Sequence, residues 1–135
     1  MTKNKTEAPE ITVEKESSSF LGRDQLLSFD DVVIEKVTLP APYNGHVFVK
    51  NASGFAWDEY QDSILVKDKD GSRTVELKGA KVKLLSHCVC DENGVLIFTQ
   101  DDILALSKKS NLLLETLTKV AQRLNGMGVE TKEKN

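Results

Sequence analysis

The sequence predicts an α+β fold that is mostly helical, with four to five helices and one small antiparallel β-hairpin. Two observations lead to this class. Residues 32–39 and 46–50 are rich in strand-forming side chains and flank a stretch of proline, asparagine and glycine, which is typical of two strands joined by a turn. Most later segments repeat apolar side chains at helical spacing, and polar or glycine-containing turns separate them.

The length of 135 residues predicts a single domain. Residues 1–18 and 129–135 are polar and charged, with few apolar side chains to offer a core, so we expect both to be disordered tails. The intervening residues 19–128 are numerous enough to form one modest α+β core.

Composition argues against two classes of partner. Eighteen Lys and Arg residues stand against 21 Asp and Glu, for a formal net charge of −3, and the nearest approach to a basic cluster is the spaced series Lys78, Lys81 and Lys83. Nucleic acid is therefore not an expected partner, because phosphate binding needs clustered basic side chains. No apolar run approaches the ~20 residues that cross a bilayer, and the N-terminus lacks an apolar signal core. We expect no membrane partner and a cytosolic location.

The first elements follow from local patterns. Residues 22–28 carry Leu26 and Leu27 and predict a short helical turn. The two strands of the hairpin flank Asn44-Gly45, a pair that favours a type I′ turn. The prolines at 40 and 42 lack a backbone donor, so they place this turn at a sheet edge or a bulge.

A helix is expected over residues 54–67, with Ser53 as its N-cap. Its apolar side is expected to hold Phe55, Trp57, Tyr60, Ile64 and Leu65. Residues 68–72 then form a turn, and residues 73–77 form a short strand or an extended link.

Three further helices complete the predicted fold. Residues 79–90 have helical spacing, and Gly94 suits the left-handed conformation that follows a helix end. Thr99 is expected to cap a fourth helix. Ser110 precedes a fifth helix over 111–125, which Gly126 ends and whose apolar stripe is Leu113, Leu114, Leu117, Val120, Ala121 and Leu124.

No motif points to catalysis, a metal or a cofactor. His87-Cys88-Val89-Cys90 invites a zinc reading, but a closed site needs four ligands, and on a helix the two cysteines are about 200° apart. Asp68-Lys69-Asp70-Gly71 resembles part of a calcium loop, yet the position of its twelfth ligand is occupied by Gly79. The acidic pairs at 30–31 and 101–102 have no nucleophile or histidine nearby in sequence. We therefore expect a protein that is not an enzyme and acts by binding other proteins.

The strongest candidate for a binding residue is Leu112. It lies about 100° outside the apolar stripe of the last helix, so Leu112, Leu113 and Leu114 cannot all face one core. Two interpretations stay open: Leu112 packs on the preceding helix across the short link at 108–110, or it is an exposed contact for another protein. The candidate partner-binding residues are Leu112, Leu113 and Leu117.

The order of the segments resembles a known family. Residues 90–99 (CDENGVLIFT), the acidic pair at 101–102, Lys109-Ser110 and the leucine helix that closes on Leu124-Asn125-Gly126 are similar to the tail assembly chaperones of phages with long, flexible tails. The proline-flanked hairpin and the acid-rich helix after Ser53 fit the same family. The resemblance covers about residues 30–128, although none of these motifs is specific by itself.

The resemblance implies a helper in the host cytoplasm that binds the tape-measure protein, helps recruit major tail-tube subunits and is absent from the mature virion. It also implies self-association, and a second form extended at its C-terminus by frameshifting. Two alternatives remain: a structural virion component, such as a tail-completion or connector protein, and a small metal-dependent enzyme that uses His87 and the cysteines.

Overall fold

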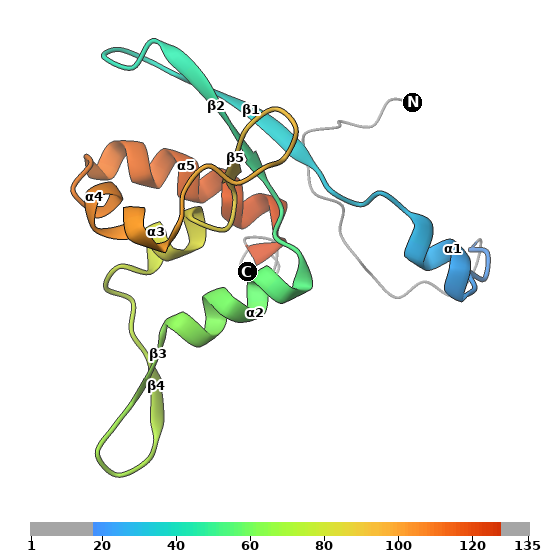
Figure 1. The fold of residues 1–135 in the computed structure, drawn as a ribbon, viewed down its shortest axis with the longest axis horizontal. Coiled ribbons are helices and arrows are strands. Elements are labelled where there is room, and N and C mark those ends of the chain that lie inside the picture. The colour runs from blue at the N-terminus through green and yellow to red at the C-terminus, as the bar shows by residue number, and fades with distance from the viewer. Residues whose placement is uncertain (1–17, 128–135) are drawn as a thin grey trace, which may run out of the picture.

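The computed structural model of the chain describes residues 18–127 and confirms the α+β class (Figure 1). Strands β1, β2 and β5 form a three-stranded antiparallel sheet, and β3 and β4 form a separate two-stranded one. The elements, in chain order, are α1 (Arg23–Ser28), β1 (Ile34–Leu39), β2 (Gly45–Lys50), α2 (Gly54–Ser63), β3 (Leu65–Lys67), β4 (Arg73–Val75), α3 (Ala80–Leu85), β5 (Val89–Cys90), the 3₁₀ helix η1 (Gln100–Asp102), α4 (Ile103–Ser107) and α5 (Asn111–Leu124). The predicted tails lie outside the described residues, apart from residue 18.

The predicted hairpin is confirmed, with Ile34 opposite Lys50 and Leu39 opposite Gly45. The predicted type I′ turn at Asn44-Gly45 is wrong. Five residues join the strands, and the carbonyl of Pro40 accepts hydrogen bonds from the amides of Tyr43 and Asn44 at 2.9 and 3.1 Å. Asn44 alone takes a positive φ in this turn, 49°. Because Gly45 pairs directly with Leu39, it belongs to the strand instead of the turn.

The helix predicted over residues 54–67 is shorter than expected. The hydroxyl of Ser53 caps α2 by accepting a hydrogen bond from the amide of Ala56, as predicted, but the helix ends at Ser63. Residues 65–67 become β3, which pairs with β4 and confirms the strand alternative for residues 73–75. Of the predicted apolar side, Tyr60 and Ile64 are buried, whereas Phe55 is 75% exposed and does not enter the core.

The helix predicted over residues 79–90 was also too long. It ends at Leu85, and residues 89 and 90 form β5 against β2. The amide of Lys50 donates to the carbonyl of Cys88 at 2.8 Å, and the register places Phe48 opposite Cys90. These long-range hydrogen bonds satisfy backbone groups that a helix would otherwise satisfy locally. Gly94 has a φ of 84°, as predicted, in the turn that follows.

The predicted caps are both present, with Thr99 at the start of η1, which leads into α4, and Ser110 at the start of α5. The hydroxyl of Thr99 accepts a hydrogen bond from the amide of Asp101, and the Asp102 carboxylate accepts one from the amide of Thr99. The hydroxyl of Ser110 accepts a hydrogen bond from the amide of Leu113 and so caps α5. The packing alternative for Leu112 is wrong, because this side chain is 74% exposed.

The core lies between the three-stranded sheet and the helices α3, α4 and α5 (Figure 1). One cluster of buried apolar side chains joins these elements, and Leu85, Val49, Ala121 and Cys88 in it have no exposed surface. Two polar contacts attach α5 to the sheet side. Arg123 donates to the carboxylate of Glu35 on β1 at 2.8 Å, and the amide of Ala52 donates to the side-chain oxygen of Asn125 at 2.9 Å.

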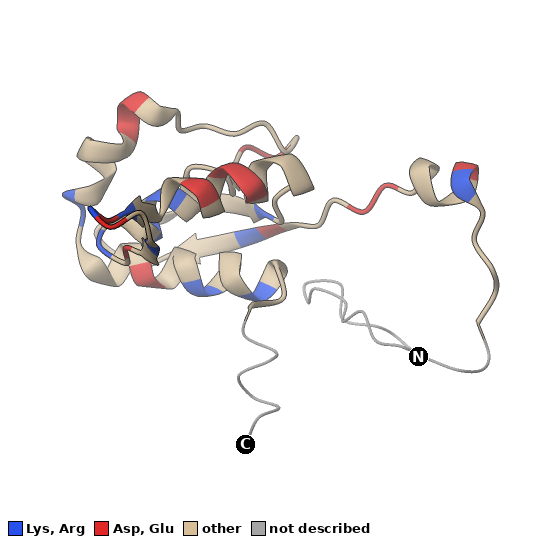
Figure 2. Cartoon of the chain, turned by 90° about the horizontal axis from the view of Figure 1, so that it is seen from below, with Lys and Arg blue, Asp and Glu red and all other residues tan. Residues whose placement is uncertain are grey.

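Helix α1 stands apart from this body in both views (Figures 1 and 2). None of its residues is buried. Figure 2 also shows acidic segments along α2 and on the stretch between α1 and β1, which holds Asp30 and Asp31. The body is therefore a single sheet-and-helix core with two extensions, α1 and the β3–β4 hairpin.

Candidate partner-binding surface

The structure separates the three candidate binding residues. Leu112 lies in the first turn of α5 and is 74% exposed, whereas Leu117 is buried in the core. Leu113 is partly buried and packs against the same core. Only Leu112 therefore offers a free apolar side chain to a partner. Leu113 and Leu117 line a groove on the surface that a partner can enter.

That groove lies between the β1–β2 hairpin and the helices α4 and α5, and we call it the hairpin groove. It has a volume of about 350 Å³ and is mainly apolar. Its lining includes Leu39, Tyr43, Val47, Phe98, Leu113 and Leu117, with Asp102 and Lys109 as the charged members. A lining of this kind suits an apolar side chain of a partner, since it offers few groups for polar recognition.

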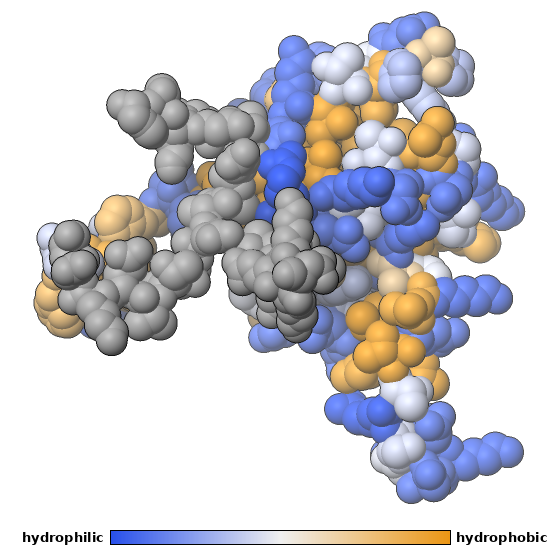
Figure 3. Space-filling model, turned by 180° about the vertical axis from the view of Figure 1, so that it is seen from behind, coloured by the Kyte–Doolittle hydropathy of each residue, from blue (hydrophilic) through white to orange (hydrophobic). Residues whose placement is uncertain are grey.

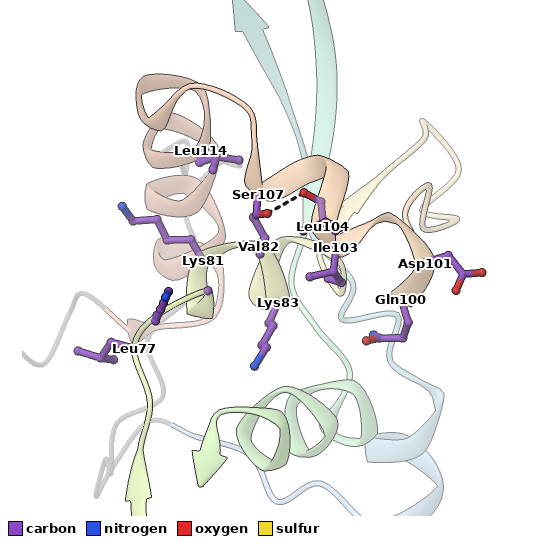
Figure 4. Close-up of a pocket in the computed structure, with 12 residues that line it drawn as sticks. Leu77, Lys81, Val82, Lys83, Gln100, Asp101, Ile103, Leu104, Ser107 and Leu114 are labelled. Carbon is purple, nitrogen blue, oxygen red and sulfur yellow. Dashed lines mark hydrogen bonds between the residues drawn. The ribbon is translucent and has the colours of Figure 1, made fainter.

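A second and larger groove, of about 700 Å³, lies between α3 and α4. Figure 4 shows Leu77, Lys81 and Lys83 toward one side of it, Gln100 and Asp101 at the other, and Ile103 and Leu104 between them. We call this the lysine-edged groove, because Lys78, Lys81 and Lys83 line it against a single acid, Asp101. The sequence analysis treated these lysines as a spaced basic series and did not connect them with Leu104, which is distant in sequence.

The lysines of this groove differ in how they are held. Lys81 forms an ion pair with Glu115 at 2.9 Å and donates to the side-chain oxygen of Asn111. The hydrogen bond from Lys81 lowers the pKa of the Glu115 carboxyl below its usual value. Lys83 donates to the carbonyl of Ser63 at the end of α2. Lys78 has no ion-pair partner in the part of the chain that the structure describes. The edge therefore retains positive charge for an acidic partner.

Exposed apolar side chains lie beside this groove. Leu77 lines it and is 76% exposed, and Val66 and Val75 on the β3–β4 hairpin are also exposed. Figure 3 shows a hydrophobic area at the base of this hairpin, and another on α1. Contiguous apolar surface on a small protein marks a contact site for other molecules. The sequence signal for this apolar area was the scattered apolar residues within 66–77, because they follow no periodicity that would assign them to a core.

The cysteine motif lies in the core and not on the predicted helix. Cys88 and Cys90 are both buried and lie in or next to β5, not on a helix. Burial raises the pKa of Cys88 to about 11, despite a hydrogen bond from Asn125, and burial also raises the pKa of Cys90. The thiolate is the metal ligand and the nucleophile, so burial disfavours the reactive form of both cysteines. Residues 18–127 hold no group of three or more potential metal-binding side chains.

The described chain is therefore a small α+β body with two mainly apolar grooves and several exposed leucines. No helix within residues 18–127 has both the length and the apolar character needed to span a bilayer. No protein-family model matches the chain, and no curated protein matches its sequence.

A solved structure does resemble it. The tail assembly chaperone of bacteriophage HK97 superimposes with a TM-score of 0.53 at 21% sequence identity, over 75% of this chain and 88% of that one. The chain therefore has a tail assembly chaperone-like fold. This agrees with the resemblance that the order of its segments predicted.

Proposed function

We propose that this protein is a tail assembly chaperone of a long-tailed bacteriophage. The observation that supports the proposal most is the fold, which the chain shares with the HK97 tail assembly chaperone over three quarters of its length. The apolar grooves and exposed leucines add a physical reason, because a protein that keeps an apolar client in solution needs accessible apolar surface of its own.

In this role the chain binds the tape-measure protein, keeps it soluble and helps to recruit subunits of the tail tube. It acts in the host cytoplasm, performs no catalysis and leaves before the virion is complete. Exposed Leu112 and the adjacent hairpin groove make the first contact with apolar side chains of the client. The acidic residues Asp58, Glu59 and Asp62 on α2 keep the complex in solution and disfavour other contacts.

Co-expression with the tape-measure protein of the same phage tests this proposal. The wild-type chain is expected to bring the tape-measure protein into the soluble fraction and to co-purify with it. Leu112→Asp is expected to reduce that yield, because a charge replaces an exposed apolar contact. Gln61→Ala on α2 serves as the matched control, since Gln61 is also exposed and lies on another element. A tape-measure protein that stays insoluble with the wild-type chain contradicts the proposal.

The alternative role predicts a different location. A tail-completion or connector protein stays in the particle, whereas a chaperone is lost from it. Mass spectrometry of purified virions is expected to find the tape-measure and tube proteins without this chain. Finding this chain there in a fixed ratio to the tube protein would assign it to the virion structure instead.

A further inference from the structure

The segment of residues 20–31, which we call the arm, exposes apolar side chains that nothing in the described chain covers. Phe20 is 90% exposed, Leu27 70%, Leu26 60% and Phe29 56%. Helix α1 within the arm has only six residues, and an isolated helix of that length is not stable in water. The arm therefore needs a surface that both covers its leucines and holds its helix.

The arm cannot reach the far side of its own body. The amide of Val33 donates to the side-chain oxygen of Asn51 at 2.8 Å, and the Asn51 side chain donates to the carbonyl of Asp31 at 3.1 Å. The chain is thus fixed to the end of β2 from Asp31 onward. Figures 1 and 2 place α1 at one end of the molecule and α3 and α4 at the other. Because Phe29 lies only two positions before Asp31, α1 stays close to this anchor at its own end of the molecule (Figure 1).

The lysine-edged groove is complementary to the arm in apolar character and in charge. It is the larger of the two grooves and has a mainly apolar lining around Val82, Ile103 and Leu104. The arm combines its leucines and phenylalanines with three aspartates and one arginine, and Arg23 pairs with Asp24. Asp30 and Asp31 therefore remain as negative charges beside apolar side chains, whereas the edge of the groove is positive. Complementary charges of this kind fix the register of an interface.

We propose that the arm of one copy of this chain occupies the lysine-edged groove of a second copy. The arm's leucines lie over Ile103 and Leu104, and its aspartates lie near Lys78 and the other lysines of the edge. This inference deepens the proposed function and rests on it. If several copies bind along one tape-measure protein, neighbouring copies are close enough to contact one another.

The contact joins two different surfaces. Each copy that gives its arm to a neighbour still has an empty groove, and each copy that receives an arm still has a free one. Association of this kind continues until a ring closes or the chain of copies ends. The number of copies should then rise with protein concentration.

Two complementary variants test the proposal in the full chain. Leu26→Asp/Leu27→Asp disables the arm, and Leu104→Asp disables the groove. All three leucines are at least 60% exposed, so the fold should survive, and circular dichroism checks that it does. Size-exclusion chromatography with light scattering is expected to show larger species of the wild type at higher concentration. Each variant alone should be monomeric, with self-association weakened at least about a hundredfold.

Mixing the two variants gives the decisive result. The intact arm of the groove variant fits the intact groove of the arm variant, so the mixture should form a one-to-one heterodimer and nothing larger. Gln61→Ala, at an exposed position on α2 outside the arm and both grooves, is the control and should assemble like the wild type. A wild type that stays monomeric, a variant that still assembles alone, or a mixture without heterodimer overturns the proposal. No client is present in this experiment, so it can fail while the tape-measure assay succeeds, and the reverse.

Discussion

Replacing Asn125 with alanine should destabilise the protein by removing a polar connection between α5, the sheet and α2. The side-chain oxygen of Asn125 accepts a hydrogen bond from the amide of Ala52 at 2.9 Å, just before α2 begins. Its side-chain nitrogen donates to the carbonyl of Ala121 at 2.8 Å, near the end of α5, and to the sulfur of Cys88 at 3.6 Å. One side chain thus joins three segments that are distant in sequence.

The magnitude follows from these three contacts. A neutral hydrogen bond contributes about 0.5–1.5 kcal/mol net, and a partly buried amide left without a partner adds desolvation cost. The bond to sulfur is weak, so the two bonds to backbone groups dominate. We expect Asn125→Ala to lower the free energy of unfolding by about 1.5–3 kcal/mol. The melting temperature should fall by roughly 6–12 °C for a chain of this size.

Urea denaturation followed by circular dichroism measures the change, at one fixed protein concentration because association also stabilises the folded state. Gln61→Ala is the control, since it removes a similar amide from an exposed position on α2. We expect the control to stay within about 0.5 kcal/mol of the wild type. The reasoning is refuted if Asn125→Ala is as stable as that control.

Two further predictions concern the core. Leu85→Ala should lower the free energy of unfolding by about 2–5 kcal/mol, because it leaves a cavity at a fully buried site. Leu112→Ala, at an exposed site, should stay within about 0.5 kcal/mol of the wild type. Equal effects of the two variants in urea denaturation would contradict this difference in burial. Because burial raises the pKa of Cys88 to about 11, its thiol should resist Ellman's reagent at pH 8 until guanidinium unfolds the protein. Because the pKa of Cys88 is raised to about 11 in the folded state, its contribution to the free energy of unfolding is fully present below about pH 9. That contribution declines as the pH rises toward 11, since the unfolded state loses the thiol proton first. Cys88→Ala should show a smaller decline, and rapid labelling of the folded wild type would count against this account.

Local sequence determined the features whose causes are local. The hydroxyls of Ser53, Thr99 and Ser110 cap helices at the predicted positions, because a cap needs only the backbone amides two or three residues onward. The stripe of α5 packs into the core as predicted, with Leu114, Leu117, Ala121 and Leu124 buried, because helical spacing alone sets which side chains share a face. The pairing of β1 with β2 also has a local cause, because two strand-forming runs flank a short turn.

Tertiary structure decided the segments whose backbone hydrogen-bond partners lie on another strand. Residues 86–90 have helical spacing, yet β5 forms because β2 supplies hydrogen-bond partners from some 40 positions earlier in the chain. Residues 65–67 leave α2 for β3 because β4 follows closely enough to pair with them. Both cases replace local backbone hydrogen bonds with nonlocal ones, which periodicity does not record.

The candidate site shows the same division. The sequence singled out Leu112 because its position lies off the stripe of α5, and the fold leaves it 74% exposed. It could not show that α3 and α4 enclose a groove edged by Lys78, Lys81 and Lys83, or that Leu113 and Leu117 line another one. A helical pattern determines which side chains share a face. Which of those faces stays open to a partner depends on how the helices pack against one another.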